Sequence, residues 1–313
     1  MGKVIVVTGA ANGVGKSACG KLAQAGHTVY AAMRETKGRN AHRIDEFQAQ
    51  SDKPGIDLRV VELDVSSETS VNSAIESIIA ESGRLDVVVH NVGQIVYGPT
   101  EALTSEQLAE LFDTNVLSTQ RVNRAALPQL RKQGQGLLVW VSSSSAHGGS
   151  VPFLGAYACS KAALDALALS YAGELARWGI ETTIIVPGAL GPGHYLRSGR
   201  PRDAIRAEEY ADGPTADISE VALAGLDDCD RPHAGEGVAV DCSMRLEIRL
   251  VPPRLHPHAH HIVGCHGSAL PKSIARPWEP ANPPAPGADL DLPGDPADRE
   301  RLAPLDASRL ASR

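Results

Sequence analysis

The stretch TGAANGVGKS (residues 8–17) lies between an apolar run at 4–7 and an amphipathic segment at 14–25. Its last three residues match the end of the triphosphate loop G-x-x-x-x-G-K-[ST], but that motif needs a glycine where the chain has Ala10. The glycines Gly9, Gly13 and Gly15 follow the spacing T-G-x-x-x-G-x-G instead. Glycines let a strand-to-helix turn approach a pyrophosphate, which the helix N-terminus attracts. The stretch therefore favours a dinucleotide-binding fold over a triphosphatase.

Apolar β-branched runs alternate with longer amphipathic stretches from residue 3 to about 190. We expect helices at 14–25, 67–82, 104–133 and 157–178, and strands at 4–7, 27–33, 58–63, 85–90, 137–142 and 181–186. The run at 85–90 is almost wholly apolar, which indicates a strand buried on both faces. This alternation predicts an α/β protein with a doubly wound parallel sheet, the Rossmann fold.

The sequence changes character after about residue 215. Residues 231–313 hold 13 of the 21 prolines and 6 of the 11 histidines, and GVAVDC (237–242) is one of few runs that could form a strand. We expect a catalytic domain over 1–215, with 188–215 as a mobile lid over the substrate, and an atypical tail over 216–313. Composition predicts that this tail is poorly ordered, or that a frameshift near 216–230 produced it.

The tail also contains a group of residues that could ligate a metal ion, namely His256, His258, His260, His261, Cys265 and His266. Metal sites need fixed geometry as well as suitable ligands, and a proline-rich segment supplies little of it. No metal is predicted.

Bulk properties exclude several classes of partner. A net charge of −7 argues against nucleic-acid binding. No apolar run approaches the ~20 residues of a membrane-spanning helix. The five cysteines are odd in number and contain no C-x-x-C pair, which favours a reducing, cytoplasmic setting.

Tyr157 and Lys161 are the strongest candidates for chemistry. Four residues apart on an expected helix, they lie on one face. A tyrosine with a pKa near 10 is a poor base at neutral pH, but a nearby ammonium lowers its pKa by favouring the phenolate. The pair therefore predicts a general acid/base.

Taken in chain order, the motifs of residues 3–215 resemble the short-chain dehydrogenase/reductase family. Beside the glycine turn and Tyr157-x-x-x-Lys161 they are Asp64-Val65, Asn91-Val92-Gly93, Asn115, Ser142 to Ser145, and Pro187-Gly188. The C-terminal third does not match, although 237–242 faintly resembles the family's last strand. The resemblance also implies a homodimer or homotetramer if the fold is complete.

The family implies hydride transfer between a nicotinamide cofactor and a ketone/aldehyde–alcohol pair. Tyr157 would exchange the proton, and Lys161 would bind the ribose and tune Tyr157. The family's serine precedes the tyrosine by 13 residues, which gives Ser144, with Ser143 as the alternative, to orient the substrate. Asn115 would hold a kinked helix and a proton-relaying water. Cofactor contacts are expected from Gly9, Asn12, Gly13, Val14, Gly15, Arg34, Asp64, Val65, Asn91, Gly93, Tyr157, Lys161, Pro187 and Gly188.

The end of the second expected strand indicates which cofactor is used. An enzyme that prefers NAD usually places an acid there, but this chain has Met33 followed by Arg34. Because a guanidinium can bind a 2′-phosphate, we expect NADP rather than NAD. The alternative is that Arg34 only stacks on adenine. Two alternatives to the enzyme also stay open: a non-catalytic NADP-binding relative, and a chain inactivated by disruption of its C-terminal part.

Overall fold

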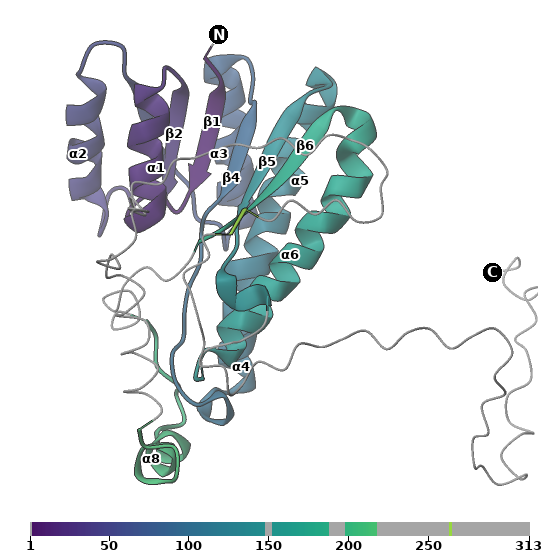
Figure 1. The fold of residues 1–313 in the computed structure, drawn as a ribbon. Coiled ribbons are helices and arrows are strands. Elements are labelled where there is room, and N and C mark those ends of the chain that lie inside the picture. The colour runs from purple at the N-terminus through teal and green to yellow at the C-terminus, as the bar shows by residue number, and fades with distance from the viewer. Residues whose placement is uncertain (1, 148–151, 188–197, 218–262, 265–313) are drawn as a thin grey trace, which may run out of the picture. The chain divides into compact units, whose positions relative to one another are not determined.

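A computed structural model describes residues 2–147, 152–187, 198–217 and 263–264. The strands form one parallel sheet in the order β3-β2-β1-β4-β5-β6-β7 (Figure 1). They are β1 (Val4–Thr8), β2 (Thr28–Met33), β3 (Asp57–Glu62), β4 (Val87–His90), β5 (Gly136–Val141), β6 (Ile180–Val186) and β7 (Val263–Gly264). The order reverses between β1 and β4, and ligands of doubly wound sheets bind at the carboxyl ends of strands at such a point. The predicted Rossmann fold is confirmed.

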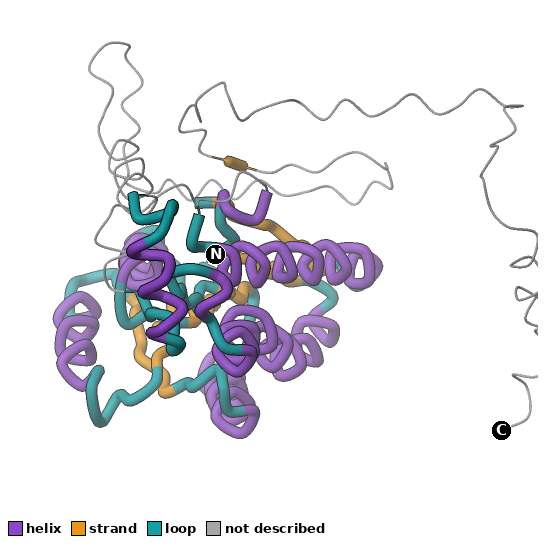
Figure 2. Tube along the Cα trace, turned by 90° about the horizontal axis from the view of Figure 1, so that it is seen from below, coloured by secondary structure: helices purple, strands orange, loops and turns teal. Residues whose placement is uncertain are grey.

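Helices cover both faces of this sheet (Figures 1 and 2). On one face, α1 (Gly13–Gln24) and α2 (Ala41–Ser51) share a hydrophobic cluster with the odd-numbered residues of β1, including Ile5 and Val7. On the other face, α3 (Glu68–Ser82), α5 (Ser118–Gln133) and α6 (Gly155–Leu175) pack on the even-numbered residues, including Val6. This division follows from the two-residue period of a strand, which sends successive side chains to opposite faces.

The expected helices and strands are largely present, with three differences in the helices. A π-helical turn, η2 (Asp113–Leu117), interrupts the helical stretch expected at 104–133 between α4 (Ser105–Phe112) and α5, at Asn115, where the resemblance implied a kink. A helix within the expected lid, α8 (Ala204–Asp212), was not expected. The helix α2 was not expected, and Phe47 is its one buried residue. The helix is polar overall, so few apolar residues mark it in the sequence.

Short elements complete the connections. They are the 3₁₀ turns η1 (Thr100–Ala102), η3 (Ser144–His147) and η4 (Ala176–Trp178), and the helix α8 (Ala204–Asp212). Within the described ranges, no helix is long and apolar enough to cross a bilayer.

Part of the expected lid, residues 198–215, is held against the body of the fold. Gly199 bridges to Val96, and the buried Gln107 of α4 donates to the Arg200 carbonyl at 2.9 Å and accepts from the Arg202 amide at 2.7 Å. The rest of the expected lid, 188–197, lies outside the described residues.

A short strand that was not expected pairs with β6. Val263–Gly264 pairs with Ile185 and Val186 of β6 and completes the edge of the sheet. The strand expected at 237–242 lies outside the described residues, as do the histidine-rich segment and nearly all of the expected tail.

His90, the last residue of β4, directly precedes Asn91 and has a buried imidazole ring. Its ring lies 4.5 Å from the Trp140 ring, and its Nε2 lies 2.8 Å from Asn123 Oδ1. Burial lowers the pKa of His90 to about 4, and the hydrogen bond to Asn123 opposes this shift. The folded chain therefore holds a neutral imidazole in the core.

We predict that His90 makes stability fall in mild acid. The unfolded imidazole binds a proton near pH 6.5 and the folded one only near pH 4. The free energy of unfolding is therefore unaffected by this group above pH 6.5 and decreases as the pH falls from 6.5 toward 4. Between pH 7.5 and 5, urea denaturation should show the wild type losing about 2 kcal/mol more than His90→Asn, which keeps a partner for Asn123. Equal losses in the two proteins would contradict a neutral buried imidazole.

Candidate active site

The glycine turn after β1 is shaped for close backbone approach. Gly9 and Gly13 have φ of +67° and +55°, a region that favours glycine. A Cβ on Gly15 would lie 2.4 Å from Asn91 Nδ2 and 2.7 Å from the Gly9 carbonyl oxygen, so no side chain fits there. A Cβ on Gly13 would point into open space, which leaves the outer side of the turn accessible. This cradle fits a cofactor pyrophosphate.

Thr8 and Asn91 join the turn to the end of β4 across the reversal of strand order. Thr8 Oγ1 donates to the Val89 carbonyl at 3.1 Å and accepts from the Asn91 amide at 3.1 Å. Asn91 Nδ2 in return donates to the Thr8 carbonyl at 2.9 Å. The two loops therefore form one rigid unit.

At the start of α1, side chains are turned toward α2. Asn12 does not cap α1 but accepts from Arg43 Nη2 at 2.7 Å, which leaves the first helical amides available to an anion. Lys16 forms an ion pair with Glu46 of α2, and these contacts with Lys16 and Arg43 lower the pKa of Glu46 to about 2. Lys16 is thus engaged on α2, as expected for a turn that is not a triphosphate loop.

Lys161 of α6 is buried between β5 and the loop after β4. Its Nζ donates to the Val141 carbonyl at 2.7 Å and lies 5.9 Å from the centroid of the Tyr157 ring. A Cβ on Gly93 would lie 3.4 Å from this Nζ, so glycine leaves the space around the ammonium open. Burial lowers the pKa of Lys161 to about 8, and Asp165 one turn further on opposes the shift.

The pKa of Tyr157 differs from the expectation. Burial raises it, and a hydrogen bond with the Ser143 side chain opposes the rise. The expected lowering by Lys161 is therefore wrong for this structure, because removing a phenolate from water outweighs the favourable contacts around the hydroxyl. Near neutral pH the structure holds Tyr157 as a protonated phenol.

Of the four consecutive serines, Ser143 is the one whose side chain acts on the pKa of Tyr157, which it lowers against the effect of burial. Ser145 Oγ also lies 2.9 Å from Ser143 Oγ. Ser144 is exposed, and its backbone amide donates to the Pro187 carbonyl at 3.1 Å. The structure thus favours Ser143, the alternative, over Ser144, the residue given by the family spacing, as the serine beside Tyr157.

Asn115 is fully buried in the π-helical turn and connects three segments. Its Oδ1 accepts from the Gln94 amide at 2.8 Å, and its Nδ2 donates to the Gln94 carbonyl at 3.0 Å and to Ser160 Oγ at 2.9 Å. Ser160 in turn donates to the Tyr157 carbonyl at 2.7 Å. The turn, a feature frequent at functional sites, aims this amide at the helix that carries Tyr157 and Lys161.

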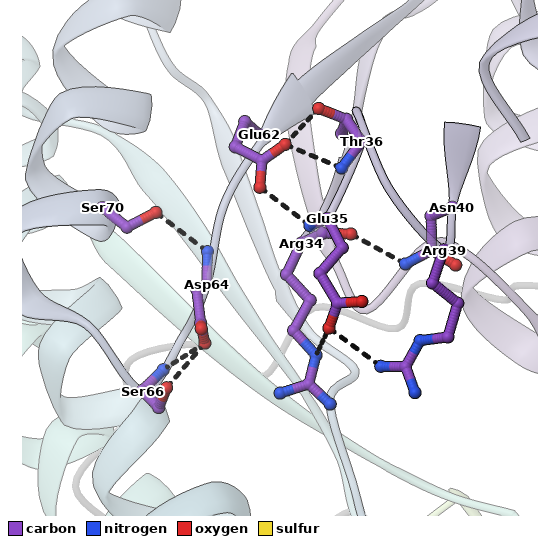
Figure 3. A network of polar contacts seen from close by, with 9 residues as sticks. All are labelled: Arg34, Glu35, Thr36, Arg39, Asn40, Glu62, Asp64, Ser66 and Ser70. Carbon is purple, nitrogen blue, oxygen red and sulfur yellow. Dashed lines mark hydrogen bonds and ion pairs between the residues drawn. The ribbon is translucent and has the colours of Figure 1, made fainter.

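Arg34 lies at the carboxyl end of β2, close to Asp64 after β3 (Figure 3). Contacts with Ser66 and the charges of Arg34 and Arg121 outweigh burial and lower the pKa of Asp64. The Val65 carbonyl accepts from Arg121 at 3.2 Å. The carboxyl edge of the sheet thus brings together three of the predicted cofactor contacts, Arg34, Asp64 and Val65.

Several residues of this site were not expected from the sequence. Gln94 and Ser160 hold Asn115, and Ser160 directly precedes Lys161, which was the available signal. Glu35, an acid beside Arg34, was also missed. Gly188 lies outside the described residues. In the described parts of the chain, no three His, Cys, Asp or Glu side chains gather into a metal site.

Fold and site together define an α/β protein of the dinucleotide-binding class with a partly buried tyrosine beside a buried lysine. A family model described as short chain dehydrogenase matches residues 3–196. An uncharacterized oxidoreductase of Staphylococcus epidermidis is 33% identical over 190 residues, 60% of this chain and 78% of that protein. A cyclopentanol dehydrogenase of a Comamonas species is 34% identical over 189 residues, 60% of this chain and 73% of that protein.

Among solved structures, a short-chain dehydrogenase from Streptomyces avermitilis superposes with a TM-score of 0.59 at 30% identity. The match covers 73% of this chain and 84% of the other. The chain therefore belongs to the short-chain dehydrogenase family and is an oxidoreductase that acts on alcohol and carbonyl groups.

We predict that Gly15→Ala damages both the fold and cofactor binding. The new Cβ would meet the Gly9 carbonyl and Asn91, so unfolding in urea should show a loss of about 1–3 kcal/mol. Binding of NADPH, followed by nicotinamide fluorescence, should weaken as the turn shifts. Gly173→Ala is the matched control, since a Cβ on this exposed helical glycine meets no atom. Equal effects of the two changes would contradict the close approach at Gly15.

Proposed function

We propose that this chain is an NADP-dependent oxidoreductase that interconverts a ketone or aldehyde and an alcohol, with Tyr157 as general acid/base. The observation that carries the proposal is a partly buried tyrosine beside a buried lysine at the carboxyl edge of the sheet: the Ser143 side chain acts on the pKa of Tyr157, and Lys161 lies one turn further along the same helix. A phenol, a hydroxyl and an ammonium in one place suit a carbonyl oxygen that gains a proton.

The cofactor would supply the hydride. Gly9, Gly13 and Gly15, with the amides at the start of α1 near Asn12 and Val14, would hold its pyrophosphate. Asp64, Val65, Asn91, Gly93 and Pro187 line the same edge of the sheet, where the rest of the dinucleotide would lie. Lys161 would bind the ribose beside Gly93. Arg34 at the end of β2 supports the preference for NADP, because its guanidinium is half exposed and available to a 2′-phosphate.

The protonated state of Tyr157 suits donation of a proton to a carbonyl oxygen, the step of a reduction. The Ser143 hydroxyl beside it would orient that oxygen. Lys161 keeps its positive charge below a pKa of about 8, which favours the phenolate left after the proton is transferred. Asn115 would maintain this arrangement by holding the loop after β4 and the first turns of α6 together.

The relative named as a cyclopentanol dehydrogenase acts on a secondary alcohol, which supports a ketone/alcohol pair as substrate. The homodimer or homotetramer implied by the family stays a prediction.

We predict that Tyr157→Phe abolishes turnover and leaves NADPH binding nearly unchanged, because only the proton-exchanging oxygen is removed. Turnover should be measured with a panel of ketones and aldehydes, and binding by nicotinamide fluorescence. Tyr171→Phe is the control, since the Tyr171 hydroxyl contacts Gln120 at 2.6 Å instead of the site. Retained turnover in Tyr157→Phe would overturn the assignment; binding without turnover in the wild type would favour a non-catalytic relative.

The serine assignment has its own test. We predict that Ser143→Ala lowers kcat by about 10²-fold or more, the usual effect of losing a hydrogen bond made to the developing charge. Ser144→Ala should lower it less than threefold, since Ser144 is exposed. The reverse order of effects would assign the role to Ser144, the residue favoured by family spacing.

A further inference from the structure

A loop between β2 and α2 carries two arginines that share one carboxylate oxygen. Glu35 Oε1 lies 3.6 Å from Arg34 Nε and 3.0 Å from Arg39 Nη2. Figure 3 shows the two guanidinium groups on either side of this oxygen. Two positive charges thus converge on the Glu35 carboxylate beside the cofactor edge of the sheet, and Arg34 also lies close to Asp64.

The backbone of this loop is fixed although its charged side chains are exposed. Glu35 has φ of +55°, a strained value for a residue other than glycine. Glu62 of β3 holds that conformation by accepting from the Glu35 and Thr36 amides at 2.8 and 2.9 Å. Asn40, itself buried, donates to the Arg34 carbonyl at 2.7 Å.

The three charged side chains, in contrast, are accessible. The exposed fractions are 55% for Arg34, 45% for Glu35 and 64% for Arg39. A strained backbone that is held by buried contacts and presents accessible charges is typical of a binding loop.

We propose that Arg39 is a second ligand of the cofactor's 2′-phosphate, and that the Glu35 carboxylate occupies the position of that phosphate until the cofactor binds. This inference rests on the proposed NADP-dependent function and adds two specificity-determining residues to it. A phosphate monoester carries nearly two negative charges and three acceptor oxygens, so it matches two guanidinium groups better than one carboxylate does.

Binding then exchanges one anion for another. The Glu35 side chain, half exposed, rotates toward solvent, and the phosphate accepts from Arg34 and Arg39 in its place. NAD has a hydroxyl instead of this phosphate and cannot displace the carboxylate in the same way. Glu35 therefore weakens NADP binding by competition, while Arg39 strengthens it.

The test compares the dissociation constants of NADPH and NADH, measured by nicotinamide fluorescence on the full chain. Arg39→Met should weaken NADPH binding about tenfold, the effect of losing one charge-assisted hydrogen bond, and leave NADH within twofold. Glu35→Gln should tighten NADPH binding roughly threefold and leave NADH unchanged, since it removes a competing charge at an exposed position. Circular dichroism should confirm that each variant is folded.

Lys37→Met is the matched control, because it removes the same charge from the same loop without removing a partner of Glu35. It should change NADPH binding less than twofold. Equal weakening by Lys37→Met and Arg39→Met would overturn the proposal, since it would reflect only general charge attraction. Loss of NADH affinity in Glu35→Gln would also overturn it and make Glu35 a ribose ligand.

The outcomes separate this inference from the function on which it rests. A wild type that binds neither nucleotide contradicts the proposed function and this proposal together. A wild type that prefers NADPH, with Arg39→Met unchanged from it, contradicts only the role of Arg39.

Discussion

The side-chain amide of Asn91 joins the two loops on which the candidate site depends. The reversal of strand order brings the ends of β1 and β4 together, and Asn91 and Thr8 connect them by hydrogen bonds of 2.9–3.1 Å. The same amide lies where a Cβ of Gly15 would be, so the glycine turn and the β4 loop constrain each other. This contact thus fixes the glycine turn and the loop that carries Gly93 beside Lys161 relative to each other.

Buried polar groups at this edge are held by partners from distant segments. Asn115 connects the loop after β4 to α6, and Lys161 donates to the end of β5. Such groups are costly to bury unless they are hydrogen-bonded, so their partners determine where they lie. Burial also sets their protonation: it raises the pKa of Tyr157 and lowers that of Lys161. The burial that accompanies the positions of these two side chains therefore also shifts their pKa values.

Sequence patterns predicted the elements with strong periodicity and failed where a contact between segments decides the local structure. The apolar strands were recognised because burial on both faces leaves only apolar residues. The resemblance implied a kinked helix at Asn115, but the partners that hold its side chain, Gln94 and Ser160, come from other segments and were not expected. The helix α2 buries one side chain and is polar overall, so few apolar residues mark it in the sequence. The contact of Ser143 with Tyr157 depends on how the loop after β5 folds, which four identical residues in a row cannot indicate.

The sequence by itself determined the order of the motifs, the doubly wound fold and the family, because glycine spacing, strand burial and the Tyr157–Lys161 interval are properties of neighbouring residues. Tertiary structure alone decided the direction of the Tyr157 pKa shift, the serine that contacts it, and the placement of Glu35 between Arg34 and Arg39. Desolvation and charge pairing depend on distances across the fold, and residue order along the chain does not encode those distances directly.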